Sequence, residues 1–67
     1  MPNNVFFETC DGYVASIKTA YDAKDHKKVE AEVVWASRFL INLLASSSIG
    51  MEIFSSQMYR LLKAAGW

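Results

Sequence analysis

The chain has 67 residues, which predicts a single domain over residues 1–67 with a small core, because a chain of this length buries only about 60% of its unfolded surface. Hydrophobic side chains make up 52% of the sequence, and this fraction argues against intrinsic disorder. Seven basic residues balance seven acidic residues, so no overall field draws the protein toward nucleic acid or an anionic membrane.

The chain has few residues that could cross-link so small a fold. Cys10 is the only cysteine, so no disulfide can form within the chain, and His26 is the only histidine. A structural zinc site needs four ligands, usually Cys and His, and these two residues do not supply them. We therefore expect helix packing and self-association to stabilise the domain, as they do in other small scaffolds.

The N-terminal sequence lacks the basic segment, apolar stretch and small-residue cleavage site of a signal peptide. The most apolar segment, Val33–Ala45, carries Arg38 and Asn42 and is shorter than the roughly 20 apolar residues that span a membrane. A free thiol such as that of Cys10 is ordinary in a reducing compartment. We expect a cytoplasmic protein with no membrane partner.

Helical periodicity recurs in three segments, and no strand alternation is present. The first predicted helix begins at Asn3 or Asn4, both good N-cap residues, and runs to about Lys24. Gly12 lies inside this segment and costs up to about 1 kcal/mol relative to Ala, so a break or a later start remains open there. The apolar face of this helix consists of Phe6, Cys10, Tyr13, Val14, Ile17, Ala20 and Tyr21.

The second predicted helix has Asp25 as its N-cap and covers His26–Ala45. Apolar residues again recur at helical spacing and predict a stripe that faces the core. The residues of this inner stripe are Val29, Val33, Ala36, Leu40, Leu43 and Leu44.

Two apolar flanks widen that stripe. Trp35 and Phe39 extend it on one side, and Val34 and Ile41 extend it on the other. A helix that is apolar around most of its circumference is a central helix or meets another subunit. Two neighbouring helices rarely cover so wide an arc, so we predict an interface in a homo-oligomer. Its residues are Trp35, Phe39, Val34 and Ile41.

Three serines, Ser46–Ser48, separate this helix from the third predicted helix, Ile49–Ala65. Gly66 suits the left-handed position just past the last turn, over which Trp67 is expected to fold back. The inward-facing residues of the third helix are Met51, Phe54, Met58, Leu61, Leu62 and Ala65. The sequence thus predicts an all-α fold, a small three-helix bundle with an N-terminal antiparallel helical hairpin, which we expect to be oligomeric.

The sequence contains little that could perform catalysis. His26 lies in a turn among lysines, and Cys10 lies on an apolar face where burial suppresses thiol reactivity. No Gly-rich phosphate-binding motif or zinc-protease signature is present. We predict no catalytic residue, no metal ligand and no cofactor. The segment Ser46–Gly50 precedes a helix and is a candidate for anion binding through backbone amides, with simple capping as the alternative.

The segment Ser55–Trp67 begins with serines and continues through Tyr-Arg-Leu-Leu-Lys to a glycine. It resembles the recognition helix of transposase-like and winged helix-turn-helix domains. The resemblance implies that this helix binds DNA. Lys63 would contact phosphate, and the residues facing the major groove would be Ser55, Ser56, Gln57 and Arg60. Against it, Gly50 comes too early for the expected turn, and a neutral chain is a poor basis for DNA affinity.

Taken together, the absence of catalytic motifs and the excess of apolar surface favour a small non-enzymatic regulatory or interaction protein. We predict that it binds another protein, which the sequence does not identify, and also binds itself as a homo-oligomer. DNA binding through the third helix is the alternative prediction. Sequestration of a small ligand or nucleotide is a weaker one.

Overall fold

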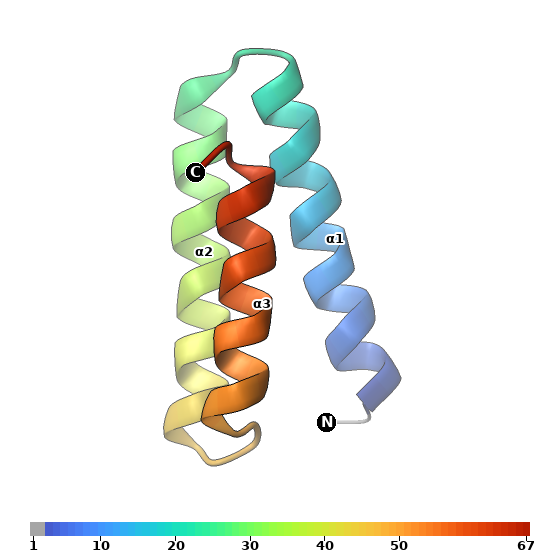
Figure 1. The fold of residues 1–67 in the computed structure, drawn as a ribbon, viewed down its shortest axis with the longest axis vertical. Helices are drawn as coiled ribbons and strands as arrows, with labels where there is room; N and C mark the ends of the chain where they lie inside the picture. The colour runs from blue at the N-terminus through green and yellow to red at the C-terminus, as the bar shows by residue number, and fades with distance from the viewer. Residues whose placement is uncertain (1–2) are drawn as a thin grey trace.

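The computed structural model describes residues 3–67, which form three helices, α1 (Asn3–Asp22), α2 (His26–Ala45) and α3 (Met51–Ala64). The helices pack against one another, and α2 runs antiparallel to both α1 and α3 (Figure 1). No strand occurs between residues 3 and 67. The predicted all-α three-helix bundle, with an antiparallel hairpin at its N-terminal side, is therefore confirmed.

The turn between α1 and α2 follows the sequence pattern closely. The helix α1 continues through Gly12 without a break and ends at Asp22, two residues before the predicted end. It ends there because Lys24 takes a left-handed conformation, with a φ of 59°, that a helix cannot contain. The Asp25 carboxylate accepts a hydrogen bond from the backbone N–H of Lys28 (3.3 Å), so the predicted N-cap and bounds of α2 are both confirmed.

The connection between α2 and α3 is longer than predicted, because α3 begins at Met51 and Ile49 belongs to the loop. The backbone N–H groups of Ser46, Ser47 and Ser48 donate hydrogen bonds to carbonyls of the last turn of α2, at 3.1, 3.1 and 2.9 Å. These three amides therefore terminate α2 and are not free to bind an anion, so within the predicted segment Ser46–Gly50 they do not support anion binding.

The C-terminal turn confirms the role predicted for Gly66, whose φ is 85°. A Cβ atom at this position would also collide with the ring of Tyr21, so glycine is needed both for the backbone conformation and for the packing against α1. The backbone N–H of Trp67 then donates to the carbonyl of Leu62 (3.0 Å) and closes the turn.

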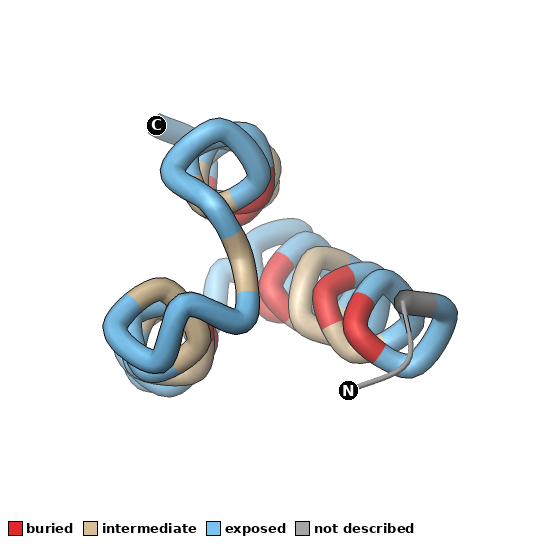
Figure 2. Tube along the Cα trace, turned by 90° about the horizontal axis from the view of Figure 1, so that it is seen from below, coloured by how far each residue is buried: buried red, intermediate tan, exposed pale blue. Residues whose placement is uncertain are grey.

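The core lies on the bundle axis and takes one fully buried aliphatic side chain from each helix: Ile17, Leu40 and Leu61. Figure 2 shows the buried positions of each helix turned toward the other two. Small residues such as Ala20 and Ala36 lie among these side chains and let the helix backbones approach closely. Most residues of the inner stripes thus face the core as the periodicity predicts, but Tyr21 and Met51 do not, because they are 44% and 62% exposed.

The contact between α1 and α2 is aromatic. The ring of Phe39 stacks on Phe6, with centroids 6.2 Å apart and an interplanar angle of 22°, and lies 6.0 Å from the ring of Tyr13. Such offset pairs add to the stabilisation that burial alone provides.

Within the described residues, no helix is both long and apolar enough to cross a membrane.

Candidate interaction surface

One side of the bundle carries large apolar side chains that the fold leaves exposed. Val34 and Ile41, seven residues apart, lie on the edge of α2 that borders α3, and they are 46% and 50% exposed. Met51, in the first turn of α3, is 62% exposed, and Trp67 is 79% exposed. We call this surface the α2–α3 face. Its half-buried members are Val33, Met58 and Leu62.

Helical periodicity places these residues on the same side of the bundle. Met51, Met58 and Ala65 recur every seven residues along α3, so they form a stripe that points toward α2. Trp67 follows the left-handed Gly66 and lies at a groove of about 350 Å³ whose α2 wall includes Val33 and Val34. Trp67 thus lies beside α2, and its ring stays largely in solvent.

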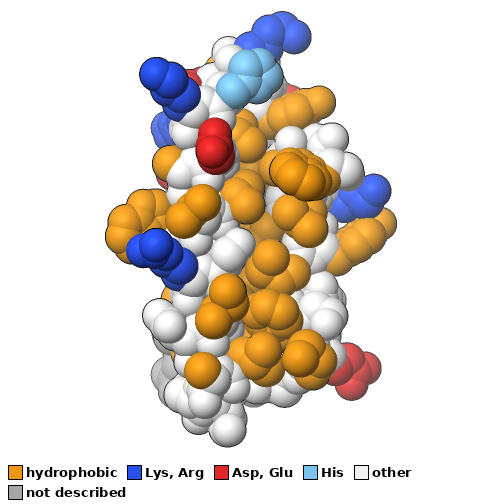
Figure 3. Space-filling model, turned by 90° about the vertical axis from the view of Figure 1, so that its left-hand side faces the viewer, with side chains coloured by type: hydrophobic (Ala, Val, Ile, Leu, Met, Phe, Trp, Pro, Cys, Tyr) orange, Lys and Arg blue, Asp and Glu red, His pale blue; other side chains and the backbone are white. Residues whose placement is uncertain are grey.

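Figure 3 views this side of the molecule and shows a continuous band of hydrophobic side chains along the seam between α2 and α3, with charged side chains at its edges. An apolar band with a polar rim is the usual composition of a protein interface. A contiguous apolar patch of more than a few hundred Å² on a small protein commonly marks a binding surface.

The four residues of the predicted interface lie in different environments, although Val34 and Trp35 line one groove. Phe39 is half-buried against Phe6 and Tyr13, so α1 covers part of its ring within the chain itself. Trp35 is 61% exposed on the outer side of α2, where the Arg38 guanidinium lies 5.6 Å from its ring centre. Val34 and Ile41 remain on the α2–α3 face.

Two members of this face were not among the predicted interface residues. Met51 was expected to face the core, but it lies in the first turn of α3 and is 62% exposed. Trp67 was expected to fold over the last turn, and it is the most exposed of the large apolar side chains in residues 3–67. A helix-end position and a chain-terminal tryptophan are the only sequence signals that point to these two residues.

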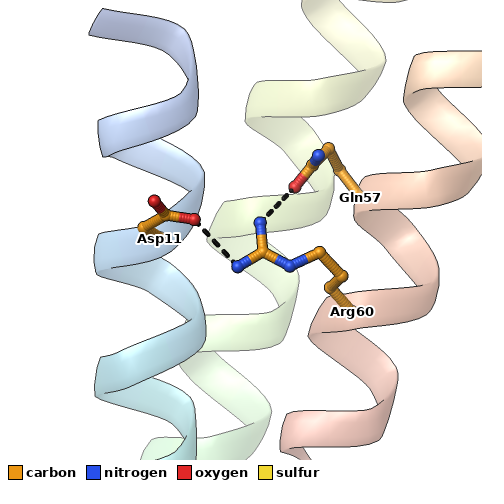
Figure 4. Close-up of polar contacts among 3 residues, drawn as sticks. All are labelled: Asp11, Gln57 and Arg60. Atoms are coloured by element: carbon orange, nitrogen blue, oxygen red, sulfur yellow. Dashed lines mark hydrogen bonds and ion pairs between the residues drawn. The ribbon is translucent and has the colours of Figure 1, made fainter. Parts of the chain in front are cut away.

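The residues proposed for DNA contact lie in different environments. Gln57 is only 6% exposed, so its side chain does not face outward as the resemblance implies. Its amide oxygen accepts a hydrogen bond from Arg60 Nη1 (2.9 Å), and Arg60 Nη2 donates to Asp11 Oδ1 on α1 (2.8 Å; Figure 4). The Arg60 guanidinium thus already pairs with a carboxylate of the chain itself.

The remaining candidates for DNA contact lie at the surface. Ser55 and Ser56 are exposed, and Lys63 Nζ lies 5.4 Å from the ring centre of Tyr59. The arrangement of the helices also differs from a helix-turn-helix, in which the two helices cross at about 90–120°. Here α2 and α3 lie side by side and antiparallel (Figure 1).

A second groove, of about 440 Å³, lies between α1 and α3 and is open to solvent. Its lining includes two aromatic rings, Tyr21 and Tyr59, and the basic residues Lys18, Arg60 and Lys63. Known small-molecule sites bury most of the surface of their ligand, and a groove this open does not. It offers no specific support for sequestration of a small ligand.

Cys10, the one cysteine of the sequence, is free and buried. Burial raises the pKa of the Cys10 thiol, partly offset by the charge of Arg60, so the reactive thiolate is disfavoured at neutral pH. Among residues 3–67, no cluster of three or more His, Cys, Asp or Glu side chains could hold a metal ion.

No protein-family model, curated protein or solved structure matches this chain.

Proposed function

We propose that this chain is a non-enzymatic interaction protein that binds protein partners, a second copy of itself included, through the α2–α3 face. One observation carries the proposal: Val34, Ile41, Met51 and Trp67 all remain about half exposed or more on a single side of the bundle. Scattered apolar side chains need no explanation, but a grouped set rimmed by charge does.

The energetics support binding through this surface. A tryptophan buries roughly 150–250 Å² when covered, and each Å² contributes about 25 cal/mol. Covering Trp67 and its neighbours on both copies would therefore contribute several kcal/mol, comparable to the whole folding stability of a small domain. Folding and association would then be coupled, as is common in chains too short to bury a large core.

The test is the oligomeric state of the wild type and of one charged variant. Light scattering after size exclusion, from micromolar to millimolar concentration, is expected to report at least a dimer. The double substitution Val34→Glu with Ile41→Glu is expected to shift the protein to monomer, because burying two carboxylates is costly. Ala15→Glu, at an exposed position of α1, is the control and leaves the dimer intact.

A wild type that remains monomeric up to millimolar concentration contradicts self-association through this face. Circular dichroism of the double variant is needed beside the scattering, and its helical content should match that of the wild type at low temperature, because both substituted side chains are already half exposed. An unchanged dimer in the folded double variant would also overturn the proposal, since it would place the interface elsewhere.

A further inference from the structure

The groove between α1 and α3 is bounded at both ends by contacts between these two parts of the chain. At one end, Arg60 of α3 reaches across to the carboxylate of Asp11 on α1 (2.8 Å; Figure 4). At the other end, the ring of Tyr21 on α1 lies against Gly66, because a Cβ atom added to that glycine would collide with the ring. The fold itself thus holds the walls of the groove, whose volume is about 440 Å³, in place.

The two walls of the groove carry the same kinds of side chain. The α1 wall contributes Lys18 and Tyr21, and the α3 wall contributes Tyr59 and Lys63. Both lysines are exposed, and neither forms an ion pair within residues 3–67. Tyr21 and Tyr59 are 44% and 63% exposed, and the Lys63 ammonium lies 5.4 Å from the centre of the Tyr59 ring. Two helices therefore direct two positive charges and two aromatic rings at one groove.

The charges of the groove favour a ligand that is moderately acidic. Its cations are Lys18, Arg60 and Lys63, and Asp22 is the only acid among the described residues that line it. Arg60 already pairs with Asp11, so the two lysines remain to bind an anion. Asp22 follows Lys18 by one helical turn at the end of α1 and repels negative charge placed beside it.

We infer that this groove binds an acidic segment of a partner protein. Carboxylates of that segment would pair with Lys18 and Lys63, and an apolar side chain between them would pack on the ring of Tyr59. Tyrosine is enriched among the residues that carry most of the binding energy at protein interfaces. No residue of the groove belongs to the α2–α3 face, so the inference goes beyond the proposed function and does not depend on it.

A nucleic acid fits this groove less well than a peptide. Its backbone carries a phosphate at every nucleotide, so a strand along the groove would bring phosphates against Asp22 as well as the lysines. A peptide can place its carboxylates opposite Lys18 and Lys63 and an uncharged residue opposite Asp22. The net charge of the chain is zero, so it also supplies no general attraction for a polyanion.

The experiment measures binding of a rhodamine-labelled peptide of alternating glutamate and leucine to the full-length chain, by fluorescence anisotropy at about 0.1 M salt, which screens distant charges. A peptide with glutamine in place of every glutamate is expected to bind roughly tenfold more weakly. The double substitution Lys18→Gln with Lys63→Gln is expected to weaken binding of the acidic peptide by roughly three- to tenfold, because it removes two charge pairs.

The matched control removes the same charge elsewhere. Lys27 and Lys28 are exposed lysines of the first turn of α2 and do not line the groove. Lys27→Gln with Lys28→Gln is therefore expected to change the affinity for the acidic peptide by less than about twofold. An equal loss in the control and in the Lys18 and Lys63 variant overturns the inference, because it would show a general electrostatic attraction.

Two further variants separate recognition from folding. Asp22→Asn is expected to strengthen binding by about two- to threefold, because it removes the acid beside Lys18, and a gain of affinity does not arise from loss of structure. Tyr59→Ala is expected to weaken binding by about threefold or more. Circular dichroism of this variant should show the helical content of the wild type, since the side chain is 63% exposed.

Two other results overturn the inference. One is an acidic peptide that binds no more tightly than its glutamine analogue. The other is a short oligothymidylate that binds more tightly than the acidic peptide and depends on Lys18 and Lys63 in the same way, which would make the groove a nucleic-acid site. The proposed function is tested by the oligomeric state, so none of these results bears on the α2–α3 face.

Discussion

The two flanks of α2 are similar in sequence and differ in what covers them. On the flank toward α1, Phe39 lies against two aromatic rings, and the chain itself completes the contact. On the flank toward α3, Val34 and Ile41 are half exposed, although they are as hydrophobic as many core residues. The difference shows that a wide apolar arc does not by itself say which part of it the fold covers.

The reason lies in the geometry of three helices. Each helix of such a bundle contacts two neighbours, which together cover little more than the arc around the bundle axis. The side chains of α1 on the Phe39 flank are aromatic and reach far enough to cover that side. On the other flank α3 contributes Met58 and Leu62, which are half-buried, and Val34 and Ile41 stay half exposed, so the outer part of the seam is open. That open flank is where we place the binding surface.

The largest effect on stability is expected from a substitution in the core, which lies between the two flanks of α2. Ile17 is fully buried, and Ile17→Asp is expected to cost more than about 4 kcal/mol and to unfold the domain, because a carboxylate there has no partner. Thermal unfolding followed by circular dichroism measures this. The control is Ala15→Asp, at an exposed position of the same helix, which should melt close to the wild type. Equal melting temperatures for both variants would show that α1 does not pack through Ile17.

A second pair of substitutions compares the covered and the exposed aromatic side chains of α2. Phe39→Ala is expected to lower the free energy of unfolding by about 2–4 kcal/mol, because it removes both ring contacts and leaves a cavity. Trp35→Ala, on the outer side of the helix, should change it by less than about 1 kcal/mol. Urea unfolding at a fixed protein concentration measures both values. A reversal of this order would mean that Trp35, and not Phe39, is covered in solution.

The smallest effects are expected at the polar contact between α1 and α3. Asp11→Ala should cost less than about 1 kcal/mol, because the Asp11–Arg60 pair is exposed to solvent, at 61% and 39%. Arg60→Ala should cost more, because it also leaves the buried Gln57 amide without its hydrogen-bond partner. Chemical denaturation of the two variants and of the double variant tests this order. Equal losses would show that Gln57 finds another partner.

The polar contact also gives a direct test of the DNA-binding alternative. If Arg60 only pairs with Asp11 of α1 and Lys63 only lines the groove between α1 and α3, replacing both by Ala leaves duplex affinity unchanged in a gel shift at moderate salt. A clear loss of binding by a variant that remains folded would favour the recognition-helix interpretation, in which the two side chains contact the DNA.

The sequence by itself determined the three helices and most of their ends, because capping and periodicity are local effects. The Asp25 carboxylate caps the N-terminal end of α2, and Gly66 takes the left-handed conformation that other residues rarely adopt. Most of the core stripes were equally predictable, with Met51 and Tyr21 as exceptions, since residues three and four apart on a helix share a face wherever that helix is placed.

Only the tertiary structure decided which apolar residues remain in solvent and which polar residues are buried. Phe39 and Val34 are both flanking residues by periodicity, and the aromatic side chains of α1 decide that Phe39 alone is covered. Gln57 is polar and was expected at the surface, yet it is buried because Arg60, held by Asp11 from another helix, satisfies its amide oxygen. Such contacts depend on residues far apart in the chain, which helical periodicity does not relate to one another.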